Sequence, residues 1–180
     1  VAFARLPETA DEAKAISNII KKIYNIEPRI YLDKEAVEEV LDNIKESPEI
    51  LYISTHGFFL EGKDMGIALE NSMIRSGIAL AGAEKSRKEG RGDGIVTAEK
   101  ITGMNLKGTS LVVLPNCDTA VGVPEAGEGV FGLRRAFILA GAETLVMSLW
   151  KVPVKETKDQ MIEFFELMKN NSKAKALRQA

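Results

Sequence analysis

The chain has 180 residues, of which 45% are hydrophobic and 28% are charged, enough for one sizeable core and unlike a disordered chain. Lysine plus arginine (24) nearly balance aspartate plus glutamate (26), and the net charge of −2 removes the simplest argument for direct nucleic-acid binding. The single Cys and single His exclude an internal disulfide and a zinc site built only from Cys and His. No apolar run approaches about 18 residues, so we expect no membrane span and a cytoplasmic setting.

The two ends of the sequence look unfinished. The chain opens on Val1 rather than Met and closes with a helical pattern over 176–180. Neither end carries a signal that stops a helix. We therefore expect residues 1–180 to be a single domain excised from a longer protein, with partner domains outside it.

Hydrophobic periodicity and turn residues divide the chain into alternating helices and strands. In chain order the predicted elements are a helix over 9–25, a short strand over 29–32, a helix over 34–45, a strand over 50–53, two short strands over 66–70 and 76–80, a solvated loop over 81–94, a helix over 97–104, a strand over 109–114, a helix over about 130–140, a strand over 144–150 and a helix over 154–168.

Three of these predictions include specific end signals. Thr9 with Glu12 is typical of a capping box, Thr97 is the expected cap of the helix that follows it, and Gly141 is the expected C′ residue of its helix. The strands over 50–53 and 109–114 are continuous apolar runs, as in strands buried on both faces. Such an alternation predicts an α/β protein with a mainly parallel sheet.

His56 and Cys117 each follow one of these apolar strands in a predicted turn of small residues, and ligand and catalytic residues of parallel sheets lie beyond the carboxyl ends of strands. A thiol must lose its proton to attack a carbonyl, and an imidazole is suited to accept that proton near neutral pH. The backbone N–H groups of Gly57 and Cys117 would form an oxyanion hole. The alternatives are a Cys that packs as an inert core residue and a solvated loop His.

The residues around these two positions resemble the CHAT domain, a caspase-like module often fused to tetratricopeptide repeats. Residues 51–59 (LYISTHGFF) are similar to its histidine box and residues 111–119 (LVVLPNCDT) to its cysteine box. Residues 127–137, 141–152 and 176–180 are similar to later boxes in the same order, and residues 6–13 also fit. The resemblance covers nearly the whole chain. One departure is Pro115-Asn116, where the family usually has Ser-Ala.

This resemblance implies a caspase-like fold, with a mainly parallel sheet flanked by helices on both faces. It also implies a cysteine endopeptidase in which His56 is the general base and Cys117 the nucleophile, with no metal or organic cofactor. The expected partners are a protein or peptide substrate and a tetratricopeptide or other regulatory domain outside this chain. A first strand before Val1 is expected to be missing as well.

Further candidates have equally ordinary interpretations. Ser148 and Trp150 resemble the caspase stretch that pairs with an extended substrate, and the alternative is a core Trp. Asp118 is a candidate for selecting a basic P1 residue, and the alternative is a turn cap. Glu128 is expected to cap a helix start. The basic loop over 84–94 is either a docking or processing segment or simply solvated, and the glycine-rich turn over 127–129 lacks a phosphate-binding fingerprint.

Two other functions stay open on the sequence alone. One is a catalytically silent CHAT-type scaffold, and the other is an α/β ligand-binding or nucleotide-binding domain. The P1 preference, the physiological substrate, the activating signal and the oligomeric state are not encoded in any motif that we recognise.

Overall fold

A computed structural model of the chain describes residues 3, 5–59, 72–83, 94–116, 127–150 and 152–180. The chain divides into two compact units. Unit 1 comprises Val1–Ala4 and Asp33–Lys151, and unit 2 comprises Arg5–Leu32 and Val152–Ala180. Each unit is described by itself below.

A three-stranded parallel sheet forms the centre of unit 1. Its strands are β1 (Ile50–Tyr52), β5 (Leu111–Leu114) and β6 (Leu145–Met147), in the order β1-β5-β6. All four side chains of β5 are fully buried, as its Leu and Val run predicts, whereas the outer strands β1 and β6 are half-buried. The predicted α/β class is confirmed. Burial on both faces was expected for the strands over 50–53 and 109–114, and of the two only β5 is buried along its whole length.

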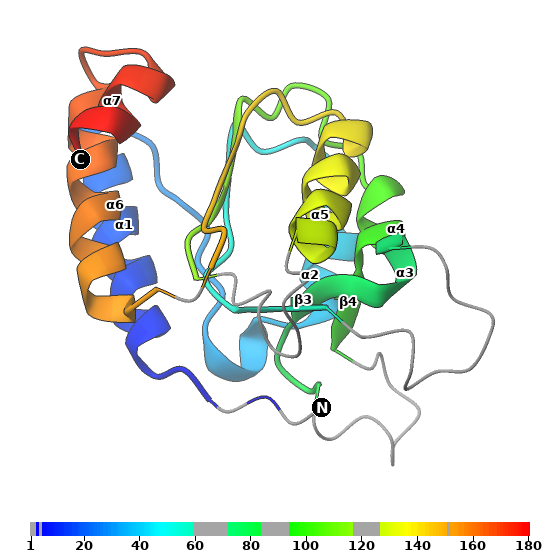
Figure 1. Cartoon of the computed structure of the whole chain (residues 1–180). Coiled ribbons are helices and arrows are strands. Elements are labelled where there is room, and N and C mark those ends of the chain that lie inside the picture. Colours follow the sequence, from blue (N-terminus) through cyan, green and yellow to red (C-terminus); the bar gives the residue numbers. More distant parts are fainter. Residues whose placement is uncertain (1–2, 4, 60–71, 84–93, 117–126, 151) are drawn as a thin grey trace. The chain divides into compact units, whose positions relative to one another are not determined.

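Helix α5 (Gly127–Ala140) connects β5 to β6 and packs its apolar stripe onto the sheet. Its buried residues recur at helical spacing and share one core cluster with β5. The helical members are Leu133, Ala136, Phe137 and Ala140, and the strand members are Val112 and Leu114. Helix α4 (Ala98–Thr102) lies beside α5 and adds the fully buried Ile101 to the same cluster (Figure 1).

The end of α5 is fixed by Gly141, as predicted. Gly141 has φ +108°, and its N–H donates to the Ile138 carbonyl at 3.0 Å while the next N–H, of Ala142, donates to Phe137 at 3.1 Å. This pair of bonds is the Schellman motif, in which glycine adopts the left-handed conformation at least cost. A Cβ at this position would also lie 2.9 Å from the Lys107 backbone N, so a side chain has no room.

An antiparallel sheet accompanies the parallel one in unit 1. It consists of β2 (His56–Phe59), β3 (Ser76–Ala79) and β4 (Ile95–Thr97), in the order β2-β3-β4. The short helix α3 (Ser72–Arg75) precedes β3. Beyond the paired residues, the Leu80 N–H donates to the Gly94 carbonyl at 2.7 Å, which holds the two ends of the β3–β4 connection together. The predicted strand over 76–80 is confirmed, and the one over 66–70 lies outside the described residues.

An ion pair connects helix α4, which follows strand β4 of this sheet, to another short helix. The Lys100 ammonium of α4 lies 2.5 Å from Glu38 of α2 (Glu38–Asp42) and also donates to the Ile95 carbonyl of β4 at 3.2 Å. Glu38 is only 8% exposed at its side chain, whereas Lys100 is 48% exposed. Helix α4 begins as predicted, because the Thr97 hydroxyl accepts a hydrogen bond from the Lys100 N–H.

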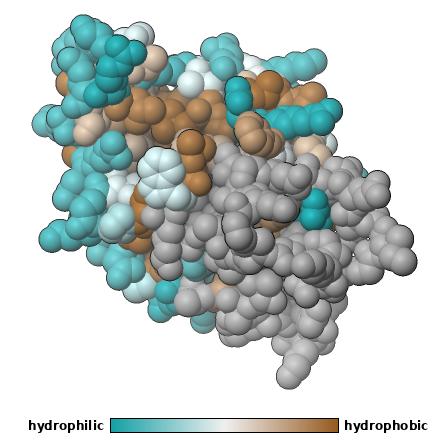
Figure 2. Space-filling view, viewed as in Figure 1, coloured by the Kyte–Doolittle hydropathy of each residue, from teal (hydrophilic) through white to brown (hydrophobic). Residues whose placement is uncertain are grey.

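Unit 2 is helical in its described residues and consists of α1 (Glu8–Tyr24), α6 (Val154–Met168) and α7 (Lys173–Gln179). Its buried apolar residues are Ile16 and Ile20 of α1, Met161, Phe164 and Phe165 of α6, and Ala176 of α7. Helix α6 has the predicted bounds, because its apolar and charged residues alternate at helical spacing. Charged and polar side chains cover the outward surface of α6 and α7 (Figure 2). No helix among the described residues is long and apolar enough to span a bilayer.

Three local predictions are wrong. Residues 29–32 form no strand, and Ile30 and Tyr31 are 38% and 45% exposed, so this run buries no face. The helix expected over 34–45 is split into η1 (Asp33–Glu35) and α2, because Val37 adopts an extended conformation between them. The glycine-rich segment over 127–129 is the first turn of α5, rather than a turn before it.

The capping box expected at the start of the chain is also wrong. Helix α1 begins at Glu8 with Pro7 at its N-cap, and no side chain caps it. Thr9 therefore lies inside the first turn, where its hydroxyl donates to the Leu6 carbonyl at 2.7 Å. Glu12 is fully buried in unit 2.

Candidate functional site

The segments that follow β1 and β5 meet at one edge of the parallel sheet. The strands run side by side in register, with Tyr52 opposite Val113, and the pairing continues as the Ile53 N–H donates to the Val113 carbonyl at 2.9 Å. Just beyond, the Asn116 side-chain amide donates to the Ser54 hydroxyl at 2.8 Å. The carboxyl edge of the sheet therefore brings together the residues that precede His56 and Cys117 in sequence, as expected for such sheets.

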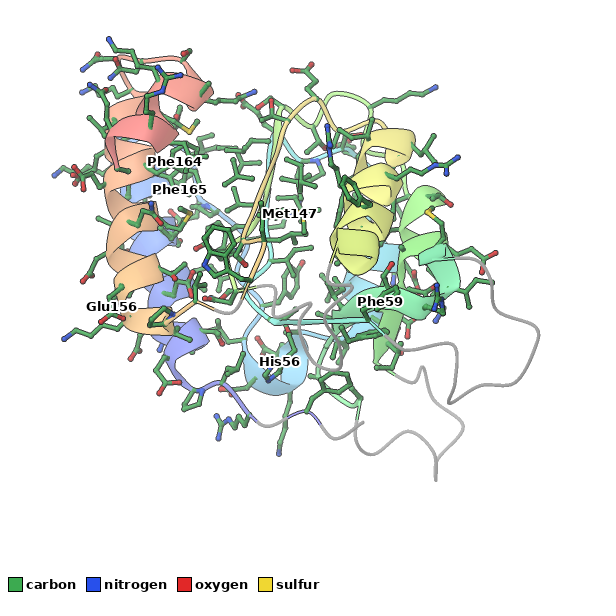
Figure 3. All side chains as sticks on the ribbon, viewed as in Figure 1. His56, Phe59, Met147, Glu156, Phe164 and Phe165 are labelled. Carbon is green, nitrogen blue, oxygen red and sulfur yellow. The ribbon has the colours of Figure 1, made fainter. Side chains whose placement is uncertain are left out.

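His56 is the first residue of strand β2, where it lies opposite Ala79 of β3 (Figure 3). The sequence predicted a turn at this position, but Ser54 and Thr55 alone form the connection, and His56 already belongs to the next strand. The Thr55 hydroxyl donates to the Ala79 carbonyl, so the residue before His56 is also held against β3. The imidazole is half-buried and is presented from a paired strand rather than from a loop.

An aromatic contact adds to the surroundings of His56. The Phe3 ring lies 5.8 Å from the His56 ring and 5.7 Å from the Phe58 ring, between centroids. His56 and Phe58 share one face of β2 because alternate residues of a strand point the same way. Phe3 therefore covers two neighbouring side chains on that face.

The other predicted site residues are distributed as follows. Gly57 is buried in β2 opposite Ile78. Cys117 and Asp118 lie outside the described residues. Ser148 follows β6 directly, and its N–H donates to the Leu114 carbonyl at 3.3 Å, which extends the β5–β6 pairing.

Trp150 is not part of the core. Its side chain is 65% exposed and that of its neighbour Leu149 is 53% exposed. The alternative interpretation of a core Trp is therefore wrong. Because β6 lies at the end of the described sheet order, these two apolar side chains follow an edge strand.

Sequence reasoning missed Ser54 and Phe3 and recorded Asn116 only as a departure from the usual small residue before the cysteine. An Asn that closely follows an apolar strand is a usable sequence signal, because such a position is often buried and buried amides are nearly always hydrogen-bonded; Asn116 is 7% exposed in the structure. Its partner was not predictable, because the contact joins residues 62 positions apart. Among the described residues, no three His, Cys, Asp or Glu side chains form a group able to hold a metal ion.

Comparison with known proteins gives the family. The sequence model of the CHAT domain matches residues 1–180. The chain belongs to the CHAT domain family. The CHAT domain is a caspase-like, peptidase-related family, which agrees with an α/β fold built on a parallel sheet.

A curated relative of this CHAT domain is tetratricopeptide repeat protein 28 of Mus musculus. It is 35% identical over 82 residues, which span 46% of this chain and 3% of that protein. The match therefore places a stretch similar to this CHAT domain within a much longer protein that is named for its tetratricopeptide repeats.

Proposed function

We propose that this CHAT domain is a cysteine endopeptidase, with Cys117 as the nucleophile and His56 as the general base. The observation that carries the proposal is the bond between Asn116 and Ser54. In sequence, His56 is two residues after Ser54 and Cys117 is one residue after Asn116, and successive Cα atoms are about 3.8 Å apart. Cys117 is therefore bonded to a residue at this edge of the sheet, which supports the proposed pairing with His56.

The proposed reaction proceeds in two stages. The His56 imidazole takes the thiol proton, and the Cys117 sulfur bonds to the carbonyl carbon of the scissile peptide. The resulting oxyanion accepts hydrogen bonds from the backbone N–H groups of Gly57 and Cys117. The imidazolium then gives its proton to the leaving amine, and the C–N bond breaks to leave a thioester. A water molecule, deprotonated by His56, cleaves the thioester and restores the thiol.

Strand β6 supports the choice of an extended peptide as substrate. Protease substrates commonly bind as an added strand, and β6 ends the described sheet order with Ser148, Leu149 and Trp150 directly after it. We propose that Ser148 and Trp150 line substrate subsites. The Ser148 N–H is already bonded to Leu114 within the sheet, and Trp150 contributes an exposed apolar surface for a substrate side chain. Asp118 is the proposed acceptor for a basic P1 residue.

The likeness to a tetratricopeptide repeat protein supports a regulatory partner of that kind. We propose that tetratricopeptide repeats in the same or an associated polypeptide control this CHAT domain. The peptidase proposal itself is tested on the domain alone.

The first test uses the single Cys of the chain, because any thiol label reports Cys117 alone. Alkylation by iodoacetamide is followed from pH 5 to 10 in the wild type and in His56→Ala. We expect a wild-type thiol pKa below the ordinary value of about 8.5, because a neighbouring imidazolium favours the thiolate. Loss of His56 should return the profile to that value. A profile that is ordinary and indifferent to His56 would contradict the dyad and favour a silent scaffold.

A peptide library then tests hydrolysis. We expect Cys117→Ala to abolish cleavage and His56→Ala to reduce it by a factor of about 10²–10⁴. Trp150→Ala should raise KM with the fold intact, because the side chain is already exposed. Asp118→Asn should weaken a preference for Lys or Arg at P1. A library profile that is insensitive to this change would remove Asp118 from the pocket.

A further inference from the structure

The segment from Ile53 to His56 is held from two sides. On one side the Ile53 N–H bonds to Val113 and the Ser54 hydroxyl accepts the Asn116 amide, so both contacts reach β5 or its extension. On the other side Thr55 and His56 are attached to Ala79 of β3. These four consecutive residues therefore connect the parallel sheet to the antiparallel sheet.

Asn116 occupies a distinct place among these contacts. The other three anchors of the segment, at Ile53, Thr55 and His56, lie at or within sheet pairing, whereas Asn116 reaches Ser54 through a side chain from beyond the end of β5. Its side chain is nearly inaccessible, at 7% exposure, so the amide cannot exchange this bond for bulk water without local opening. A buried hydrogen bond of this kind contributes to stability and also fixes the orientation of its two partners.

We infer that the Asn116 amide and the Ser54 hydroxyl form a positioning pair that sets the reactivity of Cys117 toward electrophiles. The inference rests on the proposed function, because it assumes that Cys117 and His56 work together. Asn116 precedes Cys117 directly, and Ser54 is separated from His56 by Thr55 alone. A bond between them constrains the backbone on both sides of the dyad. In this role both residues act through their neighbours rather than on the substrate.

The test measures the pH profile of Cys117 alkylation in Asn116→Ala, Ser54→Ala and the double variant. We expect each single change to lower the alkylation rate at pH 7 by about threefold to tenfold, the equivalent of one lost hydrogen bond. The thiol pKa should move up toward the value found in His56→Ala. The double variant should lose little more than either single variant, because both remove the same bond. Ser54→Thr, which keeps the hydroxyl, should restore a rate close to wild type.

Ser110→Ala is the matched control. The Ser110 hydroxyl donates to the Glu49 carbonyl at 3.1 Å and so also connects the flanks of β1 and β5, but at the opposite end of the strands. It should lower the unfolding temperature no more than Ser54→Ala, because the Ser110 and Leu111 N–H groups still donate to the Glu49 carbonyl, and it should leave the alkylation profile unchanged. If Asn116→Ala fails to fold, Ser54→Ala and Ser54→Thr still decide the question, because Ser54 is only half-buried.

The outcomes separate the two claims. If wild-type Cys117 depends on His56 and both Asn116→Ala and Ser54→Ala match the wild-type profile, the positioning pair is wrong and the peptidase proposal stands. If the wild-type thiol is indifferent to His56, the proposed function fails and the positioning pair fails with it. An equal loss of reactivity in Ser110→Ala would show a general weakening of the sheet and would also overturn the inference.

Discussion

The two sheets of unit 1 differ in how much room their strands leave for side chains. The central strand of the parallel sheet, β5, is a run of Leu and Val in which every side chain is buried, and Val112 and Leu114 share a core cluster with α5. Strand β3 of the antiparallel sheet is also buried along its length, but it contains Gly77 opposite Phe58, where an added Cβ would meet the Val96 carbonyl oxygen and the Phe58 ring. His56 is carried by the second sheet, whereas Asn116 extends the first. The two sheets therefore share one core cluster, which includes Ile78 and Val96 as well as β5 residues, and they differ in which of them carries the imidazole.

The largest expected effect comes from emptying the parallel core. Phe137→Ala removes a fully buried ring of α5 from the core cluster that it shares with Val112 and Leu114, and it should lower the free energy of unfolding by about 3–5 kcal/mol. Urea unfolding followed by circular dichroism measures the loss. Protein that remains folded should retain a His56-dependent alkylation profile, because β2 is untouched. A cost below about 1 kcal/mol would contradict the assignment of this core.

A smaller loss of stability, with a larger effect on His56, should follow from crowding the antiparallel sheet. A Cβ at Gly77 would lie 2.5 Å from the Val96 carbonyl oxygen and 2.7 Å from the Phe58 ring, so β3 must move. We expect Gly77→Ala to cost about 1–3 kcal/mol and to alter the alkylation profile. Nuclear magnetic resonance of the single His would show the displacement directly.

Gly103→Ala is the control for this change. Gly103 has a φ of −79°, and the nearest atom to an added Cβ, the Lys100 carbonyl oxygen, lies at 3.3 Å. A methyl group there requires a shift of only a few tenths of an ångström. It should change stability by less than about 1 kcal/mol and leave His56 unaffected. Equal responses at the two glycines would remove the distinction between the sheets.

The smallest expected effect concerns the ion pair between Lys100 and Glu38, beside the outer strand β4. Lys100→Met removes the cation that contacts the nearly buried Glu38, and we expect a cost of about 1 kcal/mol after allowing for the exposed half of the pair. Lys21→Met is the matched change in unit 2, where Lys21 pairs with Glu27 and both are exposed. Thermal unfolding should register the first substitution and scarcely the second. The reverse order would show that burial of Glu38 does not matter.

Local sequence signals predicted the parts of the fold that depend on near neighbours. Helix α6 was predicted to the residue, the Thr97 cap and the Gly141 end were predicted with their mechanisms, and β5 followed from its apolar run. These features depend on contacts a few positions apart. The burial of β5 and the class of the fold followed from the same patterns.

Prediction from the sequence was wrong where contacts between distant residues determine the local structure. His56 was expected in a turn because the segment before it is small and polar, but pairing with Ala79 draws it into β2. The helix expected over 34–45 has good periodicity, yet Ala36 accepts a hydrogen bond from the Ala81 N–H where the chain turns extended. The partner of Asn116 lies 62 positions away, which no local pattern encodes.

The bond between the Leu80 N–H and the Gly94 carbonyl has a practical consequence for protein engineering. It fixes the entry and the exit of the β3–β4 connection next to each other, so the sheet itself places no requirement on how many residues run between them. Closing a loop of twice the length costs only about 0.6 kcal/mol more. A fluorescent protein or an affinity tag inserted between residues 84 and 93 would leave β3 paired with β4, and the domain would carry its own reporter at an internal position.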